Sequence, residues 1–429
     1  MSRILTVRPD RIAASIEALA ALTEPDRPWT RRAFTPRYLD GRAWVEAAMR
    51  DAGLTPRRDA AGNLIGRRAG RGSGCGCLVI GAHSDTVPDG GRFDGIAGLA
   101  AGLEIARALG ERGITLEHDL EVIDCLAEEV SLFGVSCVGS RAIAGVLPPD
   151  WLARTAAGIT LRQGIAGVGG DPERLASAQR RDIRAYLELH IEQGPVLEAE
   201  RLDVGVVTAI AGITRIEILV EGRADHAGTT PMHARSDALV GGADLVLAVQ
   251  ALARARADRA AGHFAATVGE FAIAPNAANV VPSQARLLID ARAEHRADMT
   301  AFVADLTARA AAIAQARAVV VPPPRIVSDN PPTPADPGVL AEIEAAATML
   351  GAGHRRMASG AGHDMAWFAR IAPAAMVFVP CRGGRSHSPD EWAEPDAIAL
   401  GAEVLLQTIL RLDRRDVARR PGLDTARTT

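Results

Sequence analysis

The sequence contains no lysine: all 48 basic residues in the 429-residue chain are arginine. Enzymes that form a Schiff base through lysine are therefore excluded, as are nucleotide-binding loops that place a lysine on the phosphates. Asparagine is almost as rare. It occurs only at Asn63, Asn276, Asn279 and Asn330.

Cysteine is also scarce, with five residues and no CxxC pair. An odd number without that spacing argues against both a disulfide framework and a cysteine-ligated zinc site. The sequence also lacks the G-x-S-x-G, GxGxxG and H-E-x-x-H motifs, so none of the hydrolase or dinucleotide-binding classes that carry them is indicated. Chemistry must therefore depend on histidine and carboxylate side chains.

Neither a strong charge imbalance nor a long apolar run is present. The 48 basic and 52 acidic residues give a net charge of −4, so there is no basic excess for nucleic acid. Apolar runs such as Cys77–Ile80 and Ala374–Val379 fall well short of the roughly 20 residues of a membrane span. The N-terminal segment has no apolar signal-peptide core. We expect a cytoplasmic protein with neither nucleic acid nor membrane as a partner.

The order of expected strands and helices predicts an α/β domain split by an insertion. Strands and helices alternate up to about residue 210 and again from about residue 325, which favours a mainly parallel sheet flanked by helices. Residues 211–324 have the order β-α-β-β-α-β, which predicts an inserted α+β domain with an antiparallel sheet. We therefore expect one domain from residues 1–210 and 325–412, an inserted domain of residues 211–324, and a disordered tail of residues 413–429.

Histidines and carboxylates recur where the expected strands end. His83 follows a buried strand, Asp94 lies in the Gly-rich loop after it, Glu128–Glu129 end the next strand, and His190 and His387 accompany two more. Each alone could be structural, but sites in open α/β sheets form beyond the carboxyl ends of strands. Imidazole and carboxylate together suit zinc, cobalt, nickel or manganese. Five such ligands suit a pair of ions about 3.5–4 Å apart.

Seven segments between about Thr30 and Leu410 add a second line of argument. They read, in chain order, GAHSDTVPDGGRFDG, AEEVSLFG with GSRAIAG, ELHIEQGPVLE, GRADHAGTTPMHARSDA, PNAANVVPSQARLLIDAR, SGAGHDM and GGRSHSPDEW. As a set they resemble the M20 metallopeptidase-like family. The resemblance is to its hydantoinase/carbamoylase branch, which includes N-carbamoyl-L-amino acid hydrolases, β-ureidopropionases, allantoate amidohydrolases and ureidoglycolate amidohydrolases.

The resemblance implies a catalytic domain that binds two divalent ions per subunit. Asp94 would bridge the ions, with His83 and His190 completing one site and Glu129 and His387 the other. Members of the family usually bind zinc or manganese, and some bind cobalt or nickel. We expect zinc here, with manganese, cobalt and nickel as the alternatives.

Catalytic roles follow from the same resemblance. Glu128 would be the general base that takes a proton from metal-activated water, and Asp85 would orient His83. His226 resembles a residue that stabilises the oxyanion from a partner subunit. The inserted domain would then act as a lid and as the dimerisation domain of a homodimer.

Four residues are candidates for binding a small carboxylate-bearing substrate. Gln193 resembles a substrate-binding position, and Asn279 is a candidate because two of the four asparagines lie within four positions, at Asn276 and Asn279. The guanidinium of Arg292 could hold a carboxylate, although a surface salt bridge is an alternative. Backbone N–H groups near Gly360 precede an expected helix and could also meet an anion. We expect Asp364 to cap that helix.

The predicted activity is hydrolysis of a linear ureido or amide C–N bond, as in an N-carbamoyl-L-amino acid, allantoate or ureidoglycolate. Val130, Leu132 and Arg385 depart from the usual residues of the branch, with Val130 expected to reshape the turn beside the base. These departures bear on the substrate more than on the chemistry. An aminoacylase or dipeptidase of the same fold and a non-catalytic binding protein remain as alternatives.

Overall fold

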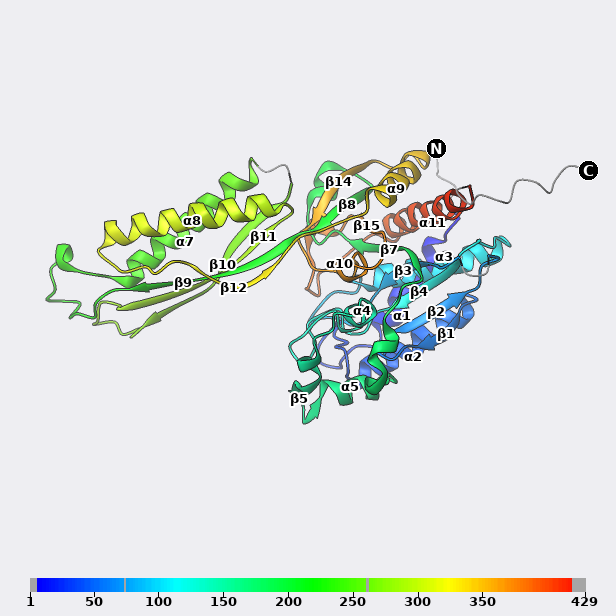
Figure 1. Ribbon diagram of the computed structural model, residues 1–429, viewed down its shortest axis with the longest axis horizontal. Helices are drawn as coiled ribbons and strands as arrows, with labels where there is room; N and C mark the ends of the chain where they lie inside the picture. Colours follow the sequence, from blue (N-terminus) through cyan, green and yellow to red (C-terminus); the bar gives the residue numbers. More distant parts are fainter. Residues whose placement is uncertain (1–5, 73–74, 260–261, 419–429) are drawn as a thin grey trace, which may run out of the picture. The chain divides into compact units, whose positions relative to one another are not determined.

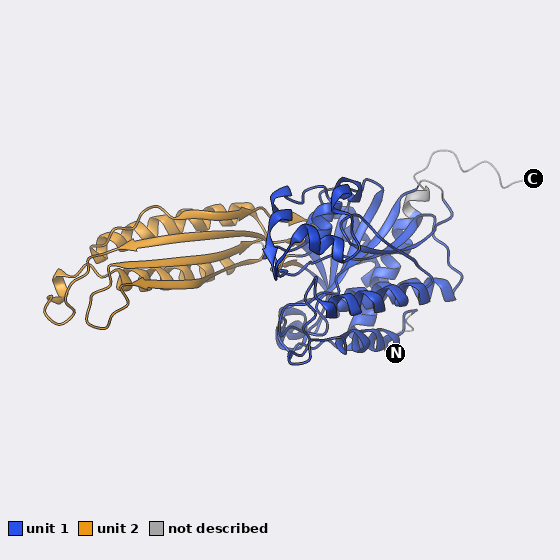
Figure 2. Ribbon diagram, turned by 90° about the horizontal axis from the view of Figure 1, so that it is seen from below, with its two compact units in different colours: residues 1–208, 335–356, 363–429 blue, residues 209–334, 357–362 orange. Residues whose placement is uncertain are grey.

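The computed structural model describes residues 6–72, 75–259 and 262–418, and the chain divides into two compact units (Figures 1 and 2). The first consists of residues 1–208, 335–356 and 363–429, and the second of residues 209–334 and 357–362. The second unit thus extends beyond the expected residues 211–324. The reason is that strand β12 (Arg325–Asn330) pairs with β9 (Gly212–Glu221) and enlarges the second unit's sheet.

The first unit is built on a sheet whose central strands are parallel. Strands β4, β3, β7 and β15 run parallel, and the strands outside them are antiparallel. The strand order is β1 (Thr55–Arg58), β2 (Leu64–Arg68), β4 (Asp119–Asp124), β3 (Cys77–Ala82), β7 (Ile183–Ile191), β15 (Ala374–Val379) and β8 (Val204–Ile210). β14 (His354–Ser359) and β13 (Thr333–Pro334) also pair with β8, and β5 (Thr155–Ala156) pairs with β6 (Ile159–Thr160). Every residue of β3 and of β15 is buried, as expected for strands covered on both faces.

Helices cover this sheet, and the predicted α/β class is confirmed. The helices are α1 (Pro9–Ala20), α2 (Pro36–Asp51), α3 (Ile96–Glu111), α4 (Val138–Ile143), α5 (Leu161–Gly167), α6 (Val196–Glu200), α9 (Pro337–Met349), α10 (Met365–Phe368) and α11 (Pro395–Ala418), with 3₁₀ turns at Pro149–Ala153, Pro172–Ala178 and Arg382–Gly384. The starts of α2 and α9 show why these segments are helical: Thr35 and Asp336 cap them, each followed by proline.

The expected disordered tail of residues 413–429 is wrong in its first part. Helix α11 continues to Ala418. One cause is Asp413, whose carboxylate accepts hydrogen bonds from the backbone N–H groups of Glu117 and His118 and so anchors the helix's last turns. Residues 419–429 lie outside the described part of the chain.

The second unit is an antiparallel sheet with two helices. Its strand order is β10 (Phe264–Ala274), β11 (Gln284–Ala293), β9 and β12, and the helices are α7 (Ala238–Ala257) and α8 (Arg296–Arg317), with a 3₁₀ turn at Met232–Ala234. Side chains alternate along β9, where Ile216, Ile218 and Val220 are buried and Leu219 is exposed. The buried set packs with α7 and α8 into one apolar core. The β-α-β-β-α-β order is the expected one, but its last strand is β12, at Arg325–Asn330, and so lies outside the expected residues 211–324.

Candidate metal centre and active site

Four neighbouring strands of the first unit deliver the candidate side chains to one place. His83 follows β3 directly, His190 is the penultimate residue of β7, and His387 lies in the loop after β15. The expected strand before Glu128 ends earlier than predicted, at Asp124. The three residues between include Ala127 with a φ of 51°. Because these strands are adjacent and parallel, their carboxyl ends bring the side chains together.

Two groups of potential ligand atoms share Asp94. One contains His83, Asp94 and His190, the other Asp94, Glu129 and His387, and within each group the ligand atoms lie within 4.8 Å of one another. Asp94 Oδ1 is 3.0 Å from His190 Nε2 and 3.4 Å from His83 Nε2. Its Oδ2 is 3.2 Å from His387 Nε2, which is also 3.2 Å from Glu129 Oε1. One carboxylate thus presents one oxygen to each group, as a bridging ligand would.

Backbone carbonyls fix the orientation of two of the imidazoles. Nδ1 of His83 lies 3.0 Å from the Asp85 carbonyl, and Nδ1 of His190 lies 2.9 Å from the Ile191 carbonyl. A carbonyl can only accept, so each Nδ1 carries a proton, and each Nε2, which faces Asp94, is the ring nitrogen left for a metal ion. Nε2 of His83 is buried and has no hydrogen-bond partner. An imidazole in this state is what a divalent cation requires as a ligand.

The pKa values show that the cluster favours positive charge. Burial alone would lower the pKa of His83 and His190, but the neighbouring carboxylates outweigh it and raise both. Hydrogen bonds to Asp94 and Glu129 raise the pKa of His387 to about 10. The pKa of Asp94 is held well below its usual value because the histidines outweigh the effect of its burial. Divalent cations supply the same compensating charge, and the donor set fits them.

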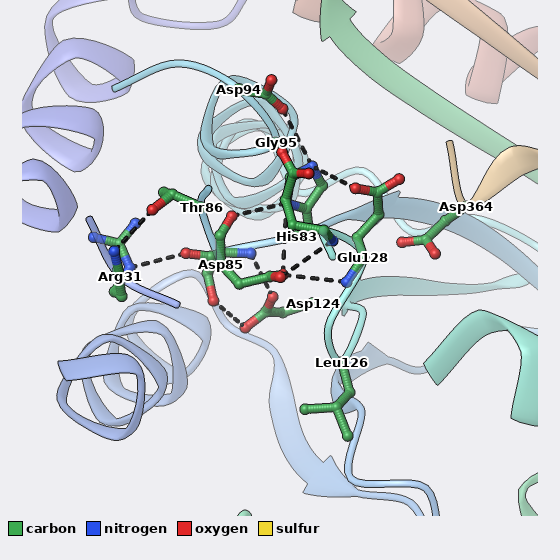
Figure 3. Close-up of polar contacts among 12 residues, drawn as sticks. Arg31, His83, Asp85, Thr86, Asp94, Gly95, Asp124, Leu126, Glu128 and Asp364 are labelled. Carbon is green, nitrogen blue, oxygen red and sulfur yellow. Dashed lines mark hydrogen bonds and ion pairs between the residues drawn. The ribbon is translucent and has the colours of Figure 1, made fainter. Parts of the chain in front are cut away.

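The side chain of Asp85 acts on a neighbouring segment (Figure 3). Its carboxylate accepts from the backbone N–H of Glu128 at 3.3 Å and of Glu129 at 3.2 Å. Its Oδ1 is 3.6 Å from Nδ1 of His83, which is too long for a hydrogen bond. Asp85 therefore contacts His83 through its backbone carbonyl, while its carboxylate holds the segment that contains Glu128 and Glu129.

Glu128 has the surroundings of a proton-transfer group. Its side chain is 8% exposed, and Oε2 lies 3.6 Å from Nε2 of His83. Burial raises the pKa of Glu128 well above its usual value, with Glu129 adding to the effect and His83 opposing it. The thiol of Cys137 is 3.7 Å from Oε1 of Glu128, and Asp364 faces the same carboxyl group in Figure 3. A carboxyl group with a raised pKa can accept a proton and return it at neutral pH.

Gln193 also lies in this cluster. Its Nε2 donates to Asp94 Oδ2 at 2.7 Å, while its Oε1 is buried without a hydrogen-bond partner. The residue has a φ of 57°, in the left-handed region. The free amide oxygen can accept a hydrogen bond from the N–H of a ligand at the centre.

The remaining candidates, His226, Asn279, Arg292 and Gly360, belong to the second unit and lie there as two separate pairs. His226 and Asn279 occur together, since the Ala227 N–H donates to the Asn279 carbonyl and His226 forms a β-bridge with Val280. Arg292 donates to the Gly360 carbonyl at 2.7 Å and to the Asp290 carboxylate at 2.8 Å. Arg292 therefore forms a salt bridge, which was the alternative to carboxylate binding.

These two pairs lie at opposite ends of the second unit's sheet. Arg292 pairs with Ile213 at one end of β9, and Gln284 pairs with Glu221 at the other, beyond which the His226 loop begins. Eight residues of extended strand separate Gln284 and Arg292 by about 27 Å. The second unit therefore does not bring His226 and Arg292 of one chain together.

The tautomer of His226 is defined by its own loop. Its Nδ1 accepts from the N–H groups of Gly228 at 3.1 Å and Thr229 at 3.2 Å. The proton of the neutral ring is therefore on Nε2, and the side chain is exposed. His226 thus presents a donor N–H to whatever approaches its ring.

Several site features were not foreseen from the sequence. Glu391 and Ser386 contact the Asp94 loop, and the one signal for them was their place in the segment that contains His387. Asp364 makes no side-chain cap on α10, so that expectation is wrong. Its carboxylate accepts from the Ser140 hydroxyl, and burial raises its pKa to about 6. Val130 is 64% exposed and does not have a positive φ.

Comparison with known proteins agrees with the resemblance seen in the sequence. The family model for Peptidase family M20/M25/M40 matches residues 79–411. An N-carbamoyl-L-amino-acid amidohydrolase of Paenarthrobacter aurescens is 38% identical over 409 residues, covering 94% of this chain and 98% of the relative. A ureidoglycolate hydrolase of Oryza sativa subsp. japonica is 35% identical over 417 residues, with 95% and 85% covered. The crystal structure of a hydantoinase/carbamoylase family amidase from Burkholderia multivorans has a TM-score of 0.86 and 37% identity, covering 95% of this chain and 98% of that one.

Proposed function

Because the chain belongs to Peptidase family M20/M25/M40, and to its amidohydrolases of non-peptide C–N bonds, we propose that it hydrolyses a linear ureido or amide bond in a small carboxylate-bearing substrate. N-Carbamoyl-L-amino acids, allantoate and ureidoglycolate are the candidates. The observation that carries the proposal is the pair of ligand groups that share Asp94 beside the buried Glu128. A cytoplasmic location is part of the same proposal.

The family is metal-dependent, and the residues present fit two divalent ions, for which zinc is our first choice and manganese, cobalt or nickel the alternatives. His83 and His190 would hold one ion, Glu129 and His387 the other, and Asp94 both. When bound, such ions supply an acidified water and polarise the scissile carbonyl.

Glu128 moves the proton in this proposal. Its carboxylate accepts a proton from the attacking water and returns it to the departing nitrogen, which completes hydrolysis without a net proton change on the enzyme. The raised pKa of Glu128 supports this role, because a carboxylate of ordinary pKa is a poor acid for the return step. Asp85 supports it by fixing the Glu128 and Glu129 backbone.

His226 is proposed to donate its Nε2–H to the oxyanion at the active site of a second subunit. Its exposed ring and its tautomer support a donor role. The distance of about 27 Å between the two ends of the second unit's sheet supports a contribution from another chain, because His226 and Arg292 of one chain are too far apart to meet one small substrate.

The surface of α7 favours a homodimer formed through the second unit. One face of this helix packs on its own sheet, but Leu247 is 64% exposed and Val240 is 39% exposed. Within the described residues α7 is the one helix with the length and composition to cross a membrane, and 33% of that apolar window is buried. A second copy would cover the remaining apolar surface, together with the edge strand β10.

Substrate recognition is proposed for the four remaining candidates. Arg292 offers a guanidinium beside Gly360 for a carboxylate, and Gln193 offers its unpartnered Oε1 to a ureido N–H. Asn279 would act with His226, its neighbour in the second unit.

The direct test is ammonia release by the metal-reconstituted protein from a panel of substrates. The panel contains N-carbamoyl-L-amino acids, β-ureidopropionate, allantoate and ureidoglycolate, with N-acyl amino acids and dipeptides assayed for amine release. Ammonia from a ureido substrate is the expected result. Cleavage of N-acyl amino acids or dipeptides alone would contradict the proposal and make the chain an aminoacylase or dipeptidase.

A further inference from the structure

Glu391 connects two loops of the first unit that each carry a candidate metal ligand. Its Oε1 accepts from the backbone N–H of Phe93 at 2.8 Å and of Asp94 at 3.0 Å. Its Oε2 accepts from the Ser386 hydroxyl at 2.8 Å. Phe93 and Asp94 precede α3, whereas Ser386 and Glu391 follow β15, nearly 300 residues later. Glu391 is 1% exposed, so solvent cannot replace these bonds.

Ser386 extends this connection to the carboxylate of Asp94. Its Oγ lies 3.0 Å from Asp94 Oδ2, the oxygen that faces His387. Nε2 of Gln193 contacts both Asp94 Oδ2 and Ser386 Oγ. Glu391 thus fixes the backbone of Asp94 directly, while the side chain of Asp94 is held by the Gln193 amide, which also contacts Ser386.

The glycine at position 91 allows this contact. A Cβ on Gly91 would lie 1.9 Å from the Glu391 carboxyl group, closer than any real contact. A side chain at position 91 would therefore require the Glu391 carboxyl group to move from its place. The Asp94 loop and the Glu391 loop therefore pack tightly against each other at this position.

The two ligand groups depend on this contact to different degrees. His83 and His190 are held by the sheet, since one follows β3 directly and the other is part of β7, and their side chains are 1% and 2% exposed. His387 lies in a loop with a φ of 52°, and its side chain is 50% exposed. Its position depends on the loop that Ser386 and Glu391 anchor.

We propose that Glu391 is a positioning residue that clamps the His387 loop onto the Asp94 loop and so forms the metal group of Asp94, Glu129 and His387. The inference rests on the proposed two-ion function and adds a residue to it. Glu391 is not a member of either ligand group and acts on the geometry of the ligands. The group of His83, Asp94 and His190 shares Asp94 but has both of its histidines on the sheet, so it depends less on Glu391.

The test is calorimetric titration of zinc into chelator-treated protein, with bound zinc counted by mass spectrometry. Wild type is expected to bind two ions. Glu391→Ala is expected to bind the ion of the His387 group about 10–100-fold more weakly, the usual cost of removing a group that orients a metal ligand. The other ion is expected to lose clearly less affinity, because it shares Asp94 but has its two histidines on the sheet. Gly91→Ala is expected to give the same selective loss by displacing Glu391. Glu391→Gln is expected to stay within about threefold of wild type, because its amide oxygen accepts the two N–H groups and its amide N–H₂ can donate to Ser386.

The matched control is Asp413→Ala, which removes another buried carboxylate that holds two backbone N–H groups of the same unit. It is expected to bind both ions as wild type does, and thermal melting of each metal-free variant measures its folding. Wild-type affinity for both ions in Glu391→Ala would overturn this inference but not the proposed function, and so would an equal loss of affinity for both ions. The inference would also fail if Asp413→Ala lost the same affinity, or if Glu391→Gln lost as much affinity as Glu391→Ala. Wild type that binds no zinc would instead overturn the proposed function, and this inference with it.

Discussion

Gly95 stands directly against the imidazole of His83. A Cβ on Gly95 would lie 2.4 Å from Cε1 and from Nε2 of His83, and the φ of Gly95 is 67°. No side chain fits there without moving the ring, and its backbone conformation is one that residues with a Cβ rarely adopt.

Gly95→Ala is therefore expected to displace His83, to remove the ion of the His83 group and to lower kcat by about 100-fold or more, since a misplaced catalytic centre costs at least that much. Gly113→Ala is the matched control, because Gly113 also has a positive φ, of 61°, but nothing within 4 Å of its Cβ position. Metal content and turnover of the two variants decide the matter. Two ions and normal turnover in Gly95→Ala would show that His83 is not a ligand.

Glu128→Gln is expected to keep both ions and to lower kcat by about 10²–10⁴-fold, the range for loss of a general base. The amide has nearly the same shape but cannot take a proton from water. Glu129→Gln is the contrasting variant, since it is expected to lose metal as well as activity. Steady-state kinetics with metal analysis separates the two, and near-normal turnover of Glu128→Gln would exclude it as the base.

Mixing two inactive variants tests whether His226 acts across a dimer. In a hybrid of a Glu128→Gln subunit and a His226→Ala subunit, one active site has an intact Glu128 and receives the intact His226 of the partner. Random exchange makes about half of the dimers hybrid, so about a quarter of wild-type activity is expected. If His226 acts only within its own chain, no activity returns. Mass spectrometry of the mixture then has to show that hybrid dimers have formed.

The contact of Asp413 with the loop at Glu117 and His118 predicts a pH-dependent contribution to stability. Burial raises the pKa of Asp413, but hydrogen bonds from the His118 side chain and from the two backbone N–H groups outweigh burial and lower it overall. A carboxylate with a lowered pKa in the folded state stabilises the fold at pH values above its unfolded pKa of about 4. This contribution disappears as the pH falls through the folded pKa.

Asp413→Asn should therefore reduce the free energy of unfolding by about 1–2 kcal/mol at pH 7, the low end for hydrogen bonds to a charged group. The difference should shrink toward zero as the pH falls below the unfolded pKa of about 4 and through the lower folded pKa. Denaturant unfolding at several pH values measures it. A difference that is constant with pH would assign the effect to packing.

The sequence predicted the location of the site better than its detail. Strand ends follow from local apolar runs, so these runs alone were enough to expect His83, His190 and His387 at one edge of the sheet. The role of the Asp85 carboxylate and the contacts of Glu391 could not be expected, because they join loops whose meeting depends on the whole fold. The same holds for Asp364, which looked like a helix cap but lies buried beside Ser140.

The contacts of two fully buried arginines also could not be predicted from the sequence. Arg31 donates to the Ser84 carbonyl, and Arg42 pairs with Asp124 at 3.0 Å. The carboxylate of Asp124 also accepts from the N–H and the hydroxyl of Ser84. Composition alone assigns arginine to the surface, and only the fold shows that these two hold the loop after β3.

The central claim is that side chains far apart in the chain jointly bind two cations that make water nucleophilic. Metal analysis of the purified protein before and after chelation, with ammonia release measured on the same samples, tests it most directly. Two divalent ions per chain are the expected result. Removing them should abolish turnover, and restoring them should recover it. A folded protein that holds no metal and hydrolyses its substrate equally well in the presence of a chelator would contradict it.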